Sequence, residues 1–145
     1  MTRPPVDERG SITPLIIGFA LLVAVLVAVV VDASAAYLRR QGLDSLADAA
    51  ALAATDGLQG DAVYTRGLGD RAEIDPAAAR RYVEDYLLSS GAFDRYPGLD
   101  WEVSSTADTV VVHVVSPLAL PLRVPGVATG ARVTGSAAAV VAVGD

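Results

Sequence analysis

One uncharged apolar stretch near the N-terminus constrains this chain more than any other feature of its sequence. No charged residue occurs between Arg9 and Asp32, and the run from Pro14 to Val31 has 18 residues, thirteen of which are Leu, Ile, Val or Phe. As a helix this run is roughly 27 Å long, close to the ~30 Å hydrocarbon core of a bilayer. Insertion of such side chains into the bilayer gains roughly 0.3 to 0.6 kcal/mol each, and no buried charge opposes it. The sequence therefore predicts a membrane span, represented by Pro14, Leu15, Phe19, Leu22, Leu26 and Val31.

The helical pattern continues beyond the predicted span. Alanine-rich sequence with interleaved charges follows it, and this composition favours helix. Arg40 and Asp44 are spaced to form an i,i+4 ion pair, and Gly57 is typical of a helix stop. We therefore expect one helix over residues 14–56, roughly 65 Å long. Its second half carries a narrow apolar stripe at three- and four-residue steps, formed by Ala35, Leu38, Gly42, Leu46, Ala49 or Ala50, and Ala53.

Small residues recur within the span. Ala20, Ala24 and Ala28 follow one another at four-residue steps, close in phase to Gly18, and form a ridge on which a partner helix can pack. Small residues are also common in membrane spans, so the alternative is that this spacing of glycine and alanine arises by chance. Asp32 either marks the depth at which the helix leaves the bilayer or pairs with an arginine of a neighbouring helix.

The remainder of the chain predicts a small domain of helix and sheet. Glycines and charged residues over 57–74 indicate a linker or long loop. Asp75 and Pro76 are typical of a helix start, and Gly91 of the end of that helix. Prolines downstream exclude an interior strand or regular helix over 116–129. Alternating or β-branched sequence predicts strands over 101–105, 109–115 and 131–143.

Together these elements predict an α+β fold. It has a long N-terminal helix, a second helix and a small three-stranded antiparallel-type sheet, whose apolar face is expected to pack on the stripe of the long helix. This arrangement is pilin-like in outline. The predicted division is a tail over residues 1–13, the membrane-spanning and amphipathic helix over 14–56, a Gly-rich linker over 57–74 and a small head over 75–145.

Composition argues against nucleic-acid binding, catalysis and cofactor binding. The net charge is −6, so the electrostatic attraction that drives nucleic-acid binding is missing. Cysteine is absent, and the one histidine, His113, lies in a valine-rich strand, where a hydrogen-bonded or edge position is expected. Asp44 and Asp48 share a helix face, but no third metal ligand accompanies them. The sequence therefore predicts a non-enzymatic protein that holds no metal or cofactor.

Several features of the first third of the chain together resemble the N-terminal segment of TadE/TadG-like Flp pilus assembly proteins. They are the RGSITPL sequence of residues 9–15, Asp32 at the end of the span, YLRR at 37–40 and ADAAALAA at 47–54. The resemblance implies a single-pass protein of the bacterial cytoplasmic membrane with its C-terminal domain outside. It also implies a minor pilin or assembly factor, whose partners are the membrane and other Tad pilus subunits in a hetero-oligomeric assembly.

Orientation follows from this resemblance alone, because Arg3 and Arg9 before the span balance Arg39 and Arg40 after it. Prepilin processing would cut between Gly10 and Ser11. Members processed in this way usually carry Glu at the fifth mature position, which here is Leu15, so the match tilts toward the TadG-like branch.

Two other readings of the N-terminus stay open. Ala33-Ser34-Ala35 fits the signal peptidase rule, and cleavage after Ala35 would release a secreted binding domain. The apolar run is longer than that of a usual signal peptide, and the helical pattern continues past this site. The third reading is a tethered subunit of some other envelope complex.

Overall fold

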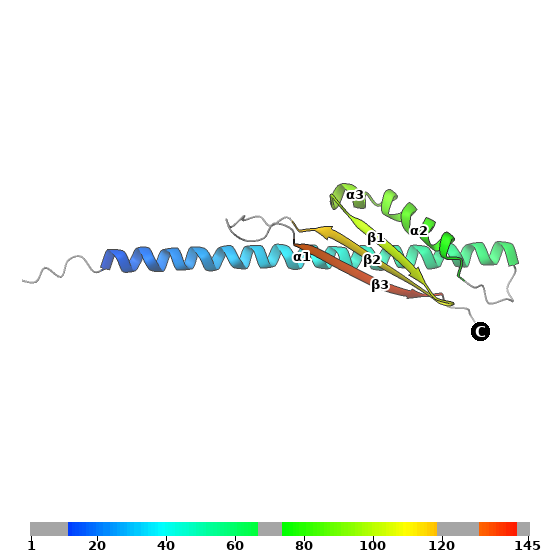
Figure 1. Ribbon diagram of the computed structural model, residues 1–145, viewed down its shortest axis with the longest axis horizontal. Helices are drawn as coiled ribbons and strands as arrows, with labels where there is room; N and C mark the ends of the chain where they lie inside the picture. The colour runs from blue at the N-terminus through cyan, green and yellow to red at the C-terminus, as the bar shows by residue number, and fades with distance from the viewer. Residues whose placement is uncertain (1–11, 67–73, 119–130, 142–145) are drawn as a thin grey trace, which may run out of the picture.

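The computed structural model describes residues 12–66, 74–118 and 131–141. Its dominant element is the helix α1 (Ile12–Arg66), which has 55 residues and is roughly 80 Å long. Figure 1 shows α1 as one rod that is bare over its N-terminal half and carries all the other elements beside its C-terminal half. The predicted α+β class, with a long apolar N-terminal helix, is therefore confirmed.

The bounds of α1 differ from the predicted helix at both ends. The helix begins at Ile12, two residues early, and it passes through Gly57 without stopping. The first part of the predicted 57–74 linker is thus helical up to Arg66, and the prediction of a stop at Gly57 is wrong. Glycine is required at this helical position because the ring of Tyr82 packs where a side chain would lie, with ring atoms 2.6 Å from an ideal Cβ position. The predicted tail up to residue 11 and the loop over 67–73 lie outside the described residues.

Helix α2 (Pro76–Ser89) begins as predicted. The Asp75 carboxylate accepts a hydrogen bond of 2.9 Å from the backbone N–H of Ala77, and Pro76 occupies the first turn, where it lacks an N–H that would need a partner. Its buried face is Ala78, Ala79, Val83 and Leu87. A single further turn, α3 (Ala92–Arg95), follows directly after Gly91.

The three predicted strands form one antiparallel sheet in the order β1 (Asp100–Ser105), β2 (Thr109–Pro117) and β3 (Arg132–Val140). The valine-rich strand β2 lies in the centre. Its even-numbered residues from Val110 to Ser116 are buried because they point toward the helices. The Pro-rich connection between β2 and β3 lies largely outside the described residues.

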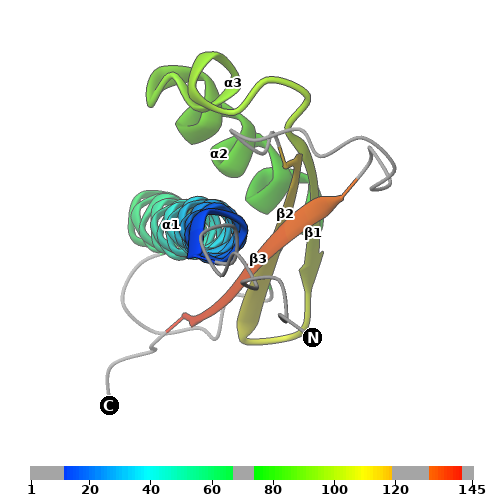
Figure 2. The same cartoon turned by 90° about the vertical axis from the view of Figure 1, so that its left-hand side faces the viewer.

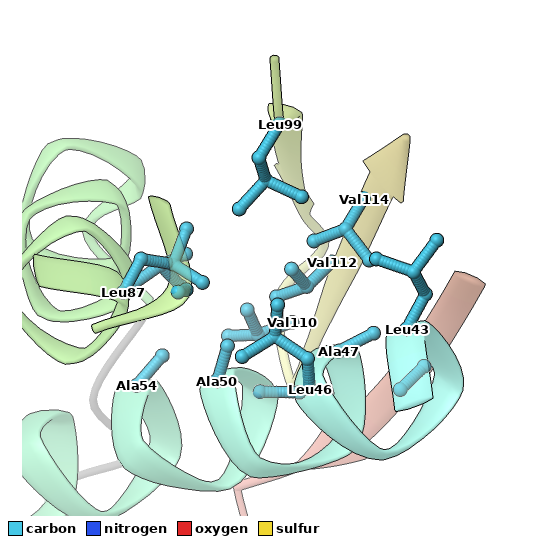
Figure 3. Close-up of a cluster of buried hydrophobic side chains, with 14 of the residues drawn as sticks. Leu43, Leu46, Ala47, Ala50, Ala54, Leu87, Leu99, Val110, Val112 and Val114 are labelled. Carbon is cyan, nitrogen blue, oxygen red and sulfur yellow. The ribbon is translucent and has the colours of Figure 1, made fainter. Parts of the chain in front are cut away.

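Both α1 and α2 lie on one face of this sheet, as the end-on view in Figure 2 shows. The core between them joins alanines and leucines of the helices to valines of β2 (Figure 3). The predicted packing of the sheet on a small-residue face of α1 is therefore confirmed. The main core members that Figure 3 labels are Leu43, Leu46, Ala47, Ala50, Ala54, Leu87, Leu99, Val110, Val112 and Val114.

The exact stripe on α1 was predicted only in part. Leu46 and Ala50 are buried, but Leu38 is 64% exposed, whereas Leu43 and Ala47, which the stripe omitted, are fully buried. The buried face is therefore rotated by about one residue from the predicted one. In an alanine-rich helix several neighbouring faces are almost equally apolar, so the spacing alone does not select the face that packs.

Two glycines of α1 lie in opposite environments and yield a paired prediction. An added Cβ at Gly60 meets nothing within 4 Å, so Gly60→Ala is expected to stabilise the protein by up to about 1 kcal/mol through helix propensity. Gly57→Ala is expected to destabilise it, because the Tyr82 ring must leave its site. Urea unfolding of the full chain in detergent micelles, followed by fluorescence of the single tryptophan, Trp101, measures both. Equal effects of the two substitutions would contradict the packing of Tyr82.

Candidate membrane-anchoring and helix-association site

The N-terminal half of α1 exposes almost every side chain. Among the described residues, α1 is the helix long and apolar enough to cross a membrane, and none of its most apolar 18-residue window is buried in the protein. The large side chains of the predicted span are each more than half exposed at Leu15, Phe19, Leu22 and Leu26. An apolar surface of this size has no cover within the described chain, which is the arrangement that a bilayer or partner helices would bury.

The small-residue ridge also lies on this bare half. An added Cβ at Gly18 meets nothing within 4 Å, and Ala20 and Ala24 are exposed. Ala28 and Asp32, at the next four-residue steps, are half-buried. The helix therefore continues the ridge as far as the beginning of the head, although association through it stays a prediction. The predicted processing pair, Gly10 and Ser11, lies outside the described residues.

An arginine cluster, which the sequence did not predict, joins α1 to the head. The Arg39 guanidinium lies 4.6 Å from the centre of the Tyr96 ring, and its Nη2 donates a hydrogen bond of 2.9 Å to the buried hydroxyl of Ser116. Gly42, one turn further along α1, allows the Tyr96 hydroxyl to approach the helix. The Arg39 contacts therefore join α1 to both the α3 end and the end of β2. The predicted pair of Arg40 and Asp44 lies beside this cluster at 3.9 Å and is largely exposed.

At the other end of the head, Tyr82 joins α2 to α1. Its hydroxyl donates a 2.6 Å hydrogen bond to the Asp61 carboxylate, and this bond, followed by smaller effects of desolvation and of the Asp61 charge, raises the pKa of Tyr82 above 10.0. The neutral phenol is thus favoured by folding, because only the neutral form can donate to Asp61.

This bond predicts a pH dependence of stability. Because the folded-state pKa is the higher one, the stabilisation is complete below the unfolded pKa of about 10 and is lost as the pH rises through the raised value. Tyr82→Phe lacks the bond at every pH, so its melting temperature is expected to fall less than that of the unsubstituted protein between pH 8 and pH 11. Parallel loss in both proteins over this range would argue against the bond. Tyr37→Phe, at a highly exposed position, is the matched control.

The described residues contain no group of three or more His, Cys, Asp or Glu side chains that could hold a metal ion. His113 lies on the exposed face of β2, opposite Glu102 of β1 and Ser136 of β3. Of the two positions expected for His113, hydrogen-bonded or edge, the central place of β2 excludes the edge.

The fold and its surfaces define a class: a small α+β head built on the second half of a helix whose first half is apolar and bare. Residues 10–63 match the family model described as "Putative Flp pilus-assembly TadE/G-like". This match confirms the resemblance of the N-terminal segment to TadE/TadG-like Flp pilus assembly proteins. It covers the bare half of α1 and most of the half that packs under the head. Neither the curated proteins nor the solved structures contain a match to this chain.

Proposed function

We propose that this protein is a membrane-anchored minor pilin or assembly factor of a bacterial Tad/Flp-type pilus or secretion system. The observation that carries the proposal is the unbroken helix α1, which is apolar and almost entirely exposed from Ile12 to Val31 and packs under the head over its second half. A single rigid element thus connects the membrane to the head, so a force or a rotation of one is transmitted to the other.

The protein acts, in this proposal, by lateral association of helices and by the surface of its head, without catalysis. The ridge of Gly18, Ala20, Ala24 and Ala28 allows close approach of another helix, which in lipid is stabilised by backbone packing. The partners are other Tad pilus subunits, in a hetero-oligomeric assembly. Family membership of the N-terminal segment supports this choice of partner.

The head lies on the extracytoplasmic side of the cytoplasmic membrane. This part of the proposal rests on the family, since the arginines around the span balance. Within the structure, α1 passes without a break through Ala33 and Ala35, so the segment that signal peptidase would have to cut is helical. That observation supports an intact anchor over release after Ala35.

Membrane fractionation of the full chain in a bacterial host tests the proposal. We expect the protein to resist extraction by alkaline carbonate and its head to be digested by protease added to spheroplasts. Sequencing of the mature N-terminus distinguishes the anchored protein from the secreted alternative, and we expect the sequence to begin at Met1 or Ser11. Recovery of a soluble product that starts at Ala36 would support the secreted alternative and overturn the anchored one.

A further inference from the structure

Two arginines, Arg39 and Arg132, lie at the end of the head that faces the bare half of α1. In Figure 1 this end is formed by the tip of β2 and the start of β3, beside the middle of α1. Arg39 reaches Ser116 from the helix side of the sheet, and Arg132 pairs with Pro117 in the next register position. Because successive residues of a strand point to opposite faces, Arg132 lies on the other face. The two arginines therefore flank the strand ends.

Neither guanidinium is neutralised by the described part of the protein. The ion pair found there within 4.0 Å joins Arg40 to Asp44 and includes neither Arg39 nor Arg132. Within the described residues, the Nε atom of Arg39 is buried and has no hydrogen-bond partner, while the guanidinium lies over the Tyr96 ring and donates a hydrogen bond to the Ser116 hydroxyl. A partly desolvated cation without a counter-ion is unfavourable, so an anion from outside the described chain would stabilise this arrangement.

The height of Arg39 above the span identifies the anion. Arg39 follows Val31 by eight residues, which places its Cα about 12 Å beyond the end of the span. Side chains of a helix lean toward its N-terminus, so an arginine side chain at this position extends back toward the bilayer. The headgroup layer extends roughly 5 to 8 Å beyond the hydrocarbon on each side. The guanidinium is thus within reach of the lipid phosphates.

From these observations we infer that the span-facing end of the head rests on the membrane, where Arg39 and Arg132 bind the phosphates of anionic phospholipids. The inference rests on the membrane anchoring proposed above and adds a ligand to it. The planar fork of a guanidinium matches two phosphate oxygens, which makes arginine suited to this contact. Since α1 and the head are joined by Arg39, the contact fixes the rotation of α1 and therefore the face that it presents to a partner helix.

The absence of cysteine allows a direct test with single labels. Thr134→Cys places a fluorophore near Arg132, and Ala107→Cys places one in the turn at the far end of the sheet, roughly 20 Å away along the strands. The full-length protein is inserted in nanodiscs of phosphatidylcholine and phosphatidylglycerol that contain lipid with a nitroxide on its headgroup. We expect at least threefold stronger quenching at position 134 than at position 107. Without phosphatidylglycerol, the quenching at position 134 is expected to fall by half or more.

Substitutions test whether the two arginines, rather than other residues of this surface, cause the quenching. Arg39→Gln with Arg132→Gln is expected to reduce quenching at position 134 to the level at position 107, and Arg132→Gln alone to reduce it about twofold. Arg132 is exposed, so its variant keeps the test valid even where loss of Arg39 weakens the head. Arg81→Gln, at an exposed position of α2, is the matched control and should leave quenching unchanged.

Equal quenching at positions 107 and 134 would overturn docking of the head. If quenching at position 134 stayed strong after substitution of both arginines and without phosphatidylglycerol, their role in phosphate binding would be overturned. Carbonate extraction of the same variants tests membrane anchoring independently of the lipid contact. Resistance to extraction with no preferential quenching rejects only the lipid contact, and loss of resistance in the unsubstituted protein rejects the anchor as well.

Discussion

Replacement of Gly135 by alanine is expected to destabilise the head by about 3 kcal/mol. Gly135 lies in the buried face of β3, and an added Cβ would overlap the backbone of α1 at Leu43 and Asp44. Overpacking of a core costs about 1 to 3 kcal/mol, and the upper end applies because a helix backbone cannot rotate away as a side chain does. A loss of this size is a large part of the 5 to 15 kcal/mol that stabilises a typical domain.

Urea unfolding of the full chain in micelles, followed by Trp101 fluorescence, gives this value. Trp101 is the only tryptophan and lies half-buried on β1, where it packs against the core and under the Arg80 guanidinium. Ser136→Ala is the matched control, since the neighbouring side chain is exposed and its loss is expected to change stability by less than about 0.5 kcal/mol. Similar midpoints for Gly135→Ala and Ser136→Ala would show that α1 does not approach β3 as closely as described.

Short-range patterns explain why much of this fold could be predicted. The span, the start of α2 at Asp75, and the strands each depend on neighbours within a few residues, through hydropathy, capping or β-branched composition. The valine-rich sequence of β2 is typical of a strand that is covered on both sides or central in its sheet, and the structure gives the central place. Antiparallel pairing then followed from a short turn between β1 and β2.

Long-range contacts explain what could not be predicted. Gly57 is required inside α1 because the Tyr82 ring packs against it, and Gly135 is required because it packs on a helix some ninety positions earlier in the chain. Neither requirement leaves a local signal, because both glycines resemble those of ordinary turns. The cluster of Arg39 and Ser116 joins residues 77 positions apart. From the sequence alone, the YLRR segment is therefore typical of an exposed helix surface.

The anchoring site illustrates a different limit. Hydropathy identified the bare half of α1, but it could not identify which helix face a partner uses, because lipid-facing and partner-facing residues are equally apolar. The buried stripe in the head shows the same ambiguity, with Leu38 exposed and Leu43 buried. Gly18 and the alanine ridge therefore remain a prediction that a second helix must test.

Two arginines in the middle of the span are expected to abolish membrane integration. Leu22→Arg with Leu26→Arg makes insertion less favourable by roughly 6 to 8 kcal/mol, since each arginine near the bilayer centre costs about 2.5 to 3.5 kcal/mol and each lost leucine removes about 0.3 to 0.6 kcal/mol. This offsets nearly all of the roughly 4 to 8 kcal/mol that thirteen large apolar side chains supply. We expect the variant to move from the carbonate-resistant fraction to the soluble or aggregated fraction.

The stability of the head shows whether the two substitutions affect membrane insertion alone. Leu22 and Leu26 are each more than half exposed and lie outside the core, so the Trp101 unfolding curve of the purified double variant in micelles should match that of the unsubstituted protein. Leu52→Arg is the matched control, because it places the same charge on the same helix at an exposed position beyond the span. If the double variant stayed carbonate-resistant, or if Leu52→Arg were extracted equally, the bare half of α1 would not be the membrane anchor. Its apolar surface would then have to be covered by other protein subunits.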